Sequence, residues 1–190
     1  MRLGILGGSF DPIHHGHLII AQLAREALGL DRVLLMVSAA QPLKEGHAVA
    51  AVHRLRMVEL AAEGIPGLEV DGREVARGGP SYTVDTLREL GREHPGAELV
   101  LLLGSDAAAG LAQWREVDAV RRLAHLVVFR RAGTPVPEGV DSVEVPLLEL
   151  SSTAIRARAS SARSLRGWVP ERVADYISGL DLYRTQGGAG

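Results

Sequence analysis

The stretch RLGILGGSFDPIHHGH (residues 2–17) joins an apolar run to two glycines and then to three histidines within four positions. Its first part, RLGILG, has the length and the near-continuous apolar character of a parallel strand that is covered on both faces. The histidines stand where a helix should begin, because HLIIAQLAREAL (17–28) carries apolar residues at helical spacing. The stretch therefore predicts a strand, a glycine turn and a helix start, which is the repeating unit of a parallel α/β sheet.

The same alternation continues along the chain. Strands are predicted at 2–7, 32–37, 68–70, 98–104, 125–129 and 142–145, and helices at 17–28, 52–63, 83–94, behind 151–153 and at 170–180. This order is typical of an α/β fold, a Rossmann-like doubly wound parallel sheet with helices on both faces, in a single domain. We expect residues 1–183 to form that domain and residues 184–190, which end in QGGAG, to be a disordered tail.

Composition narrows the classes of function. The chain has 190 residues, a formal net charge of −2 and no cysteine. The charge argues against nucleic-acid binding, and the lack of cysteine excludes disulfides, thiolate zinc sites and a cysteine nucleophile. No apolar run approaches a membrane span, and MRLGILGGSFD is too short and too soon acidic for a signal peptide. We therefore expect a cytoplasmic protein with small-molecule partners and no membrane contact, and a homo-oligomer is compatible with these features.

The turns at the carboxyl ends of the strands are where a doubly wound sheet binds its ligands. The first turn has neither the G-x-G-x-x-G nor the G-K-[ST] pattern. It offers instead Gly7 and Gly8, which allow close approach to the backbone, and a helix start, whose free amides and partial positive charge attract phosphate. His14 and His17 are three residues apart and can face one ligand. The alternatives are a metal pair or surface histidines, although a zinc site needs three or four ligands and no further one is near in the sequence.

A second helix start of this kind follows the last predicted strand, in ELSSTAIRAR (149–158). Ser151, Ser152 and Thr153 are residues that cap helices, and a capped helix alone would explain them. Arg156 and Arg158 add guanidinium groups behind the cap. Hydroxyls, backbone amides and a guanidinium together would hold a polyphosphate.

These two segments together resemble a known superfamily. GGSFDPIHHGH and SSTAIR are similar to the nucleotidyltransferases that are marked by [HT]-x-G-H and a C-terminal S-S/T-x-x-x-R. Within that superfamily, QPLK, SYTVDTL, GSD and the tryptophan of QWRE make the chain most similar to the bacterial nicotinate-nucleotide adenylyltransferases, from Gly4 to about Tyr183. The resemblance implies direct in-line transfer of the adenylyl group of ATP to nicotinate mononucleotide, with deamido-NAD and pyrophosphate as products. It also implies Mg²⁺ as the cofactor, held mainly by substrate phosphates and not by a protein metal site.

The resemblance assigns roles to individual residues. The catalytic candidates, which would contact phosphates, are His14, His17, Arg156 and Lys44, the only lysine of the chain. The ATP-binding candidates are Gly7, Gly8, Ser9, Phe10, Gly16, Gly104, Asp106, Ser151, Ser152 and Thr153. The candidates for nicotinate mononucleotide are Ser81, Tyr82, Thr83, Asp106 and Trp114. His15 stands at the variable position of the motif and is expected not to act.

Some of these residues also have simpler interpretations. Trp114 suits either stacking on a pyridinium ring or a place in the core, and Asp106 suits either the site or the cap of a short helix. Asp11, before a proline, is interpreted as a turn former and not as a metal ligand. Three rival functions stay open on the sequence alone: a phosphopantetheine adenylyltransferase, a non-catalytic nucleotide sensor, and a metal-dependent hydrolase built on the histidines.

Overall fold

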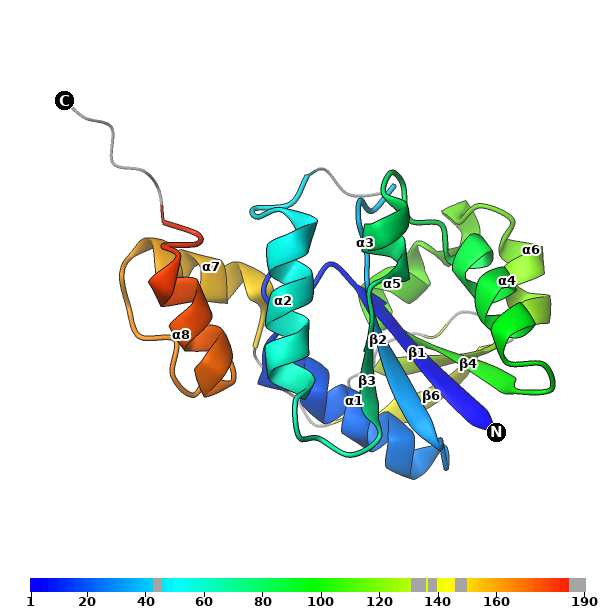
Figure 1. Cartoon of the computed structure of the whole chain (residues 1–190). Coiled ribbons are helices and arrows are strands. Elements are labelled where there is room, and N and C mark those ends of the chain that lie inside the picture. The colour runs from blue at the N-terminus through cyan, green and yellow to red at the C-terminus, as the bar shows by residue number, and fades with distance from the viewer. Residues whose placement is uncertain (43–45, 131–135, 137–139, 146–149, 185–190) are drawn as a thin grey trace.

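The sheet that the sequence predicts is present. A computed structural model describes residues 1–42, 46–130, 136, 140–145 and 150–184. The six strands found there are β1 (Arg2–Gly8), β2 (Arg32–Val37), β3 (Leu68–Asp71), β4 (Glu98–Gly104), β5 (His125–Arg130) and β6 (Asp141–Glu144). They pair in parallel in the order β3-β2-β1-β4-β5-β6, which is that of a Rossmann-like doubly wound sheet (Figure 1). The predicted fold class is confirmed.

Helices cover both faces of this sheet (Figure 1). One face is packed by α1 (His15–Ala27), α2 (Ala51–Ala62), α7 (Ser152–Ser160) and α8 (Glu171–Gly179). The other face is packed by α4 (Thr83–Glu93), α5 (Ser105–Ala109), the 3₁₀ turn η1 (Leu111–Gln113) and α6 (Val117–Leu123). The short helix α3 (Arg73–Arg77) follows β3.

Side chains of the central strands alternate between the two cores. In β1, Leu3 and Ile5 belong to the core under α4, and Leu6 belongs to the core under α1. Strand β1 pairs with β2 on one side and with β4 on the other, so the chain reverses its winding direction between β1 and β4. That reversal is where a doubly wound sheet opens a crevice at its carboxyl edge, and the turn after β1 lies at this point.

Several helical elements differ from the prediction, whose helix ranges do not include α5, η1 or α6. Helix α1 begins at His15, so the histidine motif forms its first turn, where the sequence suggested a start at residue 17. The sequence pattern predicts no helix around Arg73, where the chain forms α3. Its five residues lie between two glycines, and Arg73 holds it in place with hydrogen bonds to Asp71 and Glu93. A helix this short carries no recognisable period, which is why sequence patterning missed it.

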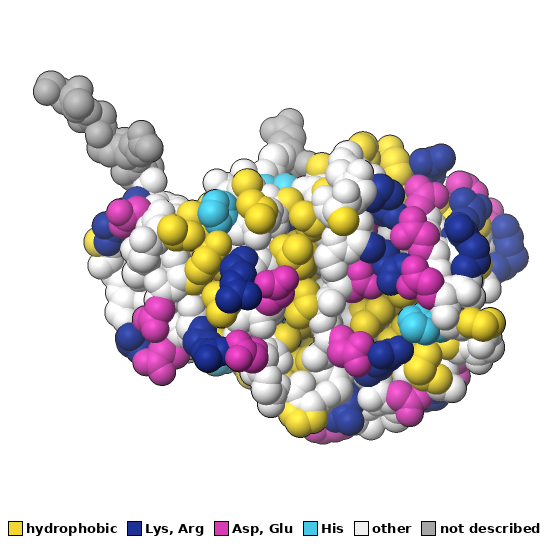
Figure 2. Space-filling model, in the orientation of Figure 1, with side chains coloured by type: hydrophobic (Ala, Val, Ile, Leu, Met, Phe, Trp, Pro, Cys, Tyr) yellow, Lys and Arg dark blue, Asp and Glu magenta, His cyan; other side chains and the backbone are white. Residues whose placement is uncertain are grey.

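The surface carries positive and negative side chains side by side. On the face drawn in Figure 2, dark-blue and magenta groups alternate and do not gather into a patch of one sign. Ion pairs such as Arg88 with Glu116, 2.6 Å apart, account for this pattern. Within the described residues, no helix is long and apolar enough to cross a membrane.

Candidate active site

The first turn of α1 brings two imidazole rings together. His14 is the N-cap residue of α1, and its ring stacks on that of His17 with centroids 3.8 Å apart and an interplanar angle of 26°. The backbone N–H of His14 donates to Nδ1 of His17 at 3.2 Å. Because Nδ1 of His17 accepts this bond, the proton of the neutral ring belongs on Nε2, which is left as a donor.

Burial keeps both rings uncharged. It lowers the pKa of His14 to about 4, helped by the charge of His15, and it lowers the pKa of His17 well below its ordinary value, helped by the neighbouring His14. Two stacked imidazolium ions would also repel each other at this distance. Near neutral pH, the helix start therefore offers imidazole N–H donors without a permanent charge.

The three glycines of the motif differ in how much space surrounds their Cα atoms. A Cβ on Gly8 would lie 3.2 Å from the ring of Phe10, which is itself buried and 5.0 Å from the ring of His17. A Cβ on Gly16 would lie 3.0 Å from Nδ1 of His14, whereas a Cβ on Gly7 would meet nothing within 4 Å. The Gly16 amide has no hydrogen-bond partner among the described residues. Open backbone and a free amide at a helix start are what an anionic ligand requires.

The start of α7 is bound directly to this turn. The hydroxyl of Ser152 donates to the carbonyl of Pro12 at 2.9 Å, and Nη1 of Arg156 donates to the carbonyl of Asp11 at 2.8 Å. Ser151 is the N-cap, as predicted, and accepts from the amide of Ala154 at 3.2 Å. The two helix starts that the sequence identified separately are thus bonded to each other, and the bond from Ser152 to Pro12 spans 140 residues of sequence. We use the name histidine cleft for the junction of these two helix starts, with α1 and α7 as its walls.

Hydroxyl and guanidinium groups of α7 have hydrogen-bond donors that are not used within the described part of the protein. Thr153 Oγ1 accepts from Nη2 of Arg156 at 3.2 Å, so the hydroxyl proton of Thr153 remains available. Thr153 is exposed and Arg156 is partly exposed. This wall of the cleft can therefore donate to an anion without giving up its own structure.

Two residues that the sequence analysis did not assign to the site, Arg54 and Asp11, hold the turn between β1 and α1 in place through hydrogen bonds. Arg54, on α2, has no exposed surface, and its guanidinium donates to the carbonyl of Ser9 at 2.6 Å and to that of Ala39 at 2.9 Å. Burial lowers the pKa of Arg54, partly offset by the charge of Asp11. The side chain of Asp11 accepts from the amide of Ala48 at 2.7 Å and from the hydroxyl of Tyr183 at 2.7 Å. Asp11 does lie in a turn, as predicted, but its carboxylate also binds distant segments.

A pocket of about 570 Å³ opens on the other side of Gly7 and Gly8, at the carboxyl edge of β1, β2 and β4. Its size is that of a small-molecule site. The predicted residues that line it are Gly7, Gly8, Ser81, Tyr82, Thr83, Gly104, Asp106 and Trp114. Every residue proposed for nicotinate mononucleotide therefore lines this one pocket, and so do Gly7 and Gly8, which precede the histidine motif in the sequence.

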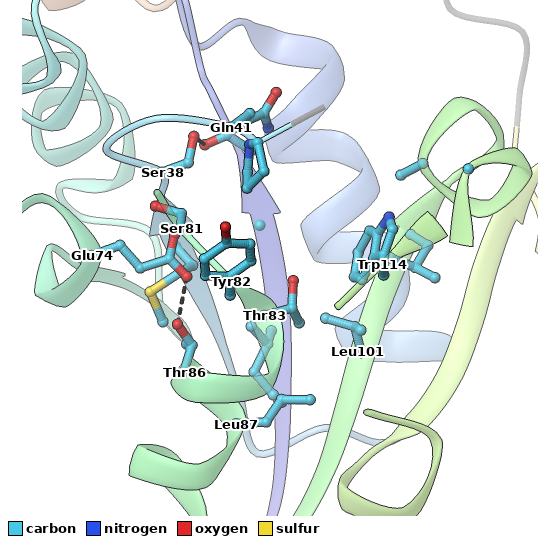
Figure 3. A pocket seen from close by; sticks show the side chains of 18 of the residues that line it. Ser38, Gln41, Glu74, Ser81, Tyr82, Thr83, Thr86, Leu87, Leu101 and Trp114 are labelled. Carbon is cyan, nitrogen blue, oxygen red and sulfur yellow. Dashed lines mark hydrogen bonds between the residues drawn. The ribbon is translucent and has the colours of Figure 1, made fainter. Parts of the chain in front are cut away.

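Tyr82 and Trp114 face each other across the pocket, with Thr83 and Leu101 between them on its floor (Figure 3). Trp114 is partly buried, packs against the core under α4 and also lines the pocket, so its place in the core is confirmed and its role in binding stays a prediction. Tyr82 is the N-cap of α4, and the amides of Thr83 and Val84 have no partner among the described residues. Two ring faces and an uncapped helix start suit an aromatic ring that bears a carboxylate.

Polar side chains around the pocket make hydrogen bonds that connect the segments lining it. Ser81 accepts from the amide of Ala39 at 2.9 Å, which ties the turn after β2 to the start of α4. Glu74 is buried and accepts from Thr86 Oγ1 at 2.6 Å, a bond that Figure 3 draws as a dashed line. Neither Ser38 nor Glu74, both lining residues, was singled out from the sequence. Asp106 is exposed at the pocket and does not cap α5, whose N-cap is Gly104.

Lys44 lies outside the described residues. Among the residues that are described, no group of three or more His, Cys, Asp or Glu side chains is arranged to hold a metal ion. The histidine pair thus has no third ligand in this part of the chain, and the carboxylate of Asp11 is already occupied by two donors. The donor set does not match a zinc centre.

Comparisons with known proteins agree with this geometry. The cytidylyltransferase-like family matches residues 5–158. A Thermus thermophilus protein named as a probable nicotinate-nucleotide adenylyltransferase is 46% identical over 187 residues, covering 97% of this chain and 100% of its own. A protein of Gemmatimonas aurantiaca with the same name is 44% identical over 196 residues, covering 97% of this chain and 93% of its own. The Plasmodium falciparum nicotinic acid mononucleotide adenylyltransferase complexed with NaAD has the same fold, with a TM-score of 0.80 at 18% identity over 96% of this chain and 97% of its own.

Fold, paired helix starts and family match define a nucleotidyltransferase of the cytidylyltransferase-like superfamily. Within that superfamily, the full-length similarity at 44–46% identity is decisive. The chain belongs to the family of nicotinate-nucleotide adenylyltransferases.

Proposed function

We propose that this chain transfers the adenylyl group of ATP to nicotinate mononucleotide and releases deamido-NAD and pyrophosphate. The observation that supports this most is the joining of the two helix starts by Ser152 and Arg156, beside a pocket walled by two aromatic rings. The cleft suits a triphosphate, and the pocket suits a pyridine ring with its carboxylate. The same family and fold occur in relatives named for this activity.

ATP would occupy the cleft. Its phosphates would accept from Nε2 of His17, from the ring of His14 and from the amide of Gly16, and on the other wall from Thr153 and Arg156. Ser151 and Ser152 would shape this wall, because their side chains already bond within the protein. The path by which the nucleotide enters would be lined by Gly7, Gly8, Ser9 and Phe10. Gly104 and Asp106 would contact the nucleotide from the carboxyl end of β4. We assign Lys44 to the phosphates by the family motif alone.

Nicotinate mononucleotide would occupy the pocket. Its ring would lie between Tyr82 and Trp114, where the positive charge of the pyridinium favours contact with an aromatic face. Its carboxylate would accept from the free amides at the start of α4, next to Thr83. Ser81 would act by holding the neighbouring turn in place.

The reaction needs no protein nucleophile. A phosphate oxygen of nicotinate mononucleotide attacks the α-phosphorus of ATP, and the bond from that phosphorus to the β-phosphate oxygen breaks in line with the attack. The protein aligns the two phosphates and donates hydrogen bonds to the oxygens on which charge develops. His17 is suited to this because its neutral ring carries its proton on Nε2 and needs no ionisation to donate.

Magnesium would arrive with the nucleotide. In this role the ion neutralises phosphate charge, and the phosphates themselves supply most of its ligands. The residues proposed to contact the phosphates fit this arrangement, because imidazole, amide and guanidinium N–H groups donate hydrogen bonds and are not the oxygen ligands that Mg²⁺ prefers. We further propose that residues 1–183 form the catalytic unit, with 184–190 as a tail, and that the reaction takes place in the cytoplasm.

A side-by-side assay tests the proposal. Pyrophosphate release from ATP is measured with nicotinate mononucleotide, nicotinamide mononucleotide and phosphopantetheine. We expect the first to be the best substrate; preference for phosphopantetheine would replace the proposed function with that of the rival transferase.

A single substitution separates the enzyme from a sensor or a hydrolase. His17→Ala should lower kcat by about 10²-fold or more, since loss of one donor to a developing oxyanion costs that much. Transfer at near wild-type rate in this variant would mean that the imidazole pair takes no part in catalysis. The wild type should keep its activity after chelation and return of Mg²⁺ alone, which a resident transition metal in the histidine pair would not allow.

A further inference from the structure

A tyrosine near the C-terminal end of the chain reaches the loop that forms the cleft. Tyr183 lies in the turn after α8, and its hydroxyl donates to Oδ1 of Asp11 at 2.7 Å, across 172 residues of sequence. Asp11 is only 5% exposed. Burial raises the pKa of Tyr183 far above its ordinary value, and the bond to Asp11 adds to this, so the phenol stays protonated as a donor. The bond therefore persists at neutral and mildly alkaline pH.

Asp11 is a junction of four segments. Besides Tyr183, its carboxylate accepts from the amide of Ala48, in the segment between β2 and α2. Its carbonyl accepts from Nη1 of Arg156, on α7, at 2.8 Å. Asp11 itself lies in the turn between β1 and α1, directly after Phe10. The position of Asp11 thus fixes both the turn that carries the histidine motif and the guanidinium proposed to bind ATP.

Loss of the tyrosine hydroxyl would leave Oδ1 of a buried carboxylate without its donor. A buried polar group that loses its hydrogen-bond partner lowers the stability of the fold by more than the bond itself contributes. The neighbouring backbone is therefore expected to move until the group finds a new partner or water. The backbone next to Asp11 is the turn that binds Arg156 and leads to His14. Neither Tyr183 nor Asp11 lines the pocket for the pyridine ring, so the effect should fall on the ATP side alone.

We propose that Tyr183 is a positioning residue of the ATP cleft, acting through Asp11 on the turn between β1 and α1 and on Arg156. The proposal rests on the assignment of this cleft to ATP. It gives the turn after α8 a task in nucleotide binding that no sequence motif indicates.

The chain contains a matched control. Tyr176, on α8, also makes one side-chain hydrogen bond, with Nδ1 of His53 on α2 at 2.9 Å, but this bond involves neither Asp11 nor Arg156. Tyr183→Phe and Tyr176→Phe each delete one phenolic hydroxyl from the same part of the chain. A purely structural role would affect the two variants alike.

The test compares both variants with the wild type by steady-state kinetics and by calorimetric titration with ATP. For Tyr183→Phe we expect KM and Kd for ATP to rise about five-fold or more, with KM for nicotinate mononucleotide within two-fold of the wild type. For Tyr176→Phe we expect both constants unchanged. Unchanged ATP constants in Tyr183→Phe, or an equal loss for both substrates, would overturn the proposal.

A second variant and a binding measurement keep the proposal testable if the first experiment fails. If Tyr183→Phe does not fold, as judged by circular dichroism, Asp11→Asn is measured in its place and judged by the same criteria. If the wild type forms no deamido-NAD, the proposed function fails, whereas titration with ATP still decides the role of Tyr183.

Discussion

The buried, uncharged state of His14 predicts how the stability of the protein depends on pH. The pKa of His14 is about 4 in the folded protein, against 6.5 when the chain is unfolded. Between these values the unfolded chain binds a proton that the folded chain does not, so stability falls as the pH falls. This contribution is fully present above pH 6.5 and is lost progressively towards pH 4. From pH 7 to pH 5 the loss from His14 alone is about 2 kcal/mol, because one proton bound only by the unfolded chain costs about 1.4 kcal/mol for each pH unit.

Urea unfolding at pH 7 and at pH 5 measures this loss. The wild type should lose stability by this amount in addition to the contributions of His17 and of the carboxylates, whereas His14→Asn should lose about 2 kcal/mol less over the same interval. The carboxylate contributions are common to both proteins and cancel in the comparison. Equal losses in the wild type and in His14→Asn would refute the claim that His14 is buried without a proton.

Two further substitutions test the division between pocket and cleft. Trp114→Ala should raise KM for nicotinate mononucleotide about ten-fold and leave KM for ATP within two-fold, because Trp114 lines the pocket proposed for the pyridine ring. An equal rise for both substrates would remove Trp114 from the proposed pyridine site. Gly7→Ala should leave the melting temperature nearly unchanged, because the added Cβ meets nothing within 4 Å in the free protein. It should nevertheless lower kcat/KM at least ten-fold, because the Cβ would occupy space that the substrates need. Normal kinetics in Gly7→Ala would show that the reacting groups do not pass over β1.

Much of the fold could be predicted because its signals are local. Each predicted strand is a short apolar run, and each long predicted helix repeats its apolar residues on one face. The two helix starts of the site could also be predicted, since histidines after β1 and hydroxyls before α7 are unusual at positions where ligands of such sheets bind. That they meet in one cleft follows from bonds between Ser152 and Pro12 and between Arg156 and Asp11, which no local pattern records.

Arg54 shows what sequence reasoning missed and what signal was available. It lies on α2 in register with Met57, Val58 and Ala61, which are three, four and seven residues further along and all buried. A charged residue on the apolar face of a helix needs partners in the core, so this spacing alone predicts a buried guanidinium with a structural task. The identity of the partners, the carbonyls of Ser9 and Ala39, could not be predicted because backbone acceptors leave no mark in a sequence. The same holds for the bond between Asp11 and Tyr183.

The division of the site between the two faces of the sheet explains why glycine is needed at the end of β1. The pocket proposed for the pyridine ring lies over the core that α4 covers, whereas α1, whose first turn carries the imidazoles, and α7 pack on the opposite face. Two phosphates that enter from opposite faces can come within bonding distance only by crossing the carboxyl edge of the sheet, and β1 is the strand that stands between them. A side chain at Gly7 would occupy that crossing, while one at Gly8 would press against Phe10 and shift the histidines behind it. On the proposed arrangement of substrates, the reaction depends on bare backbone at this point as much as on any donor, and Gly7→Ala is therefore expected to separate stability from activity.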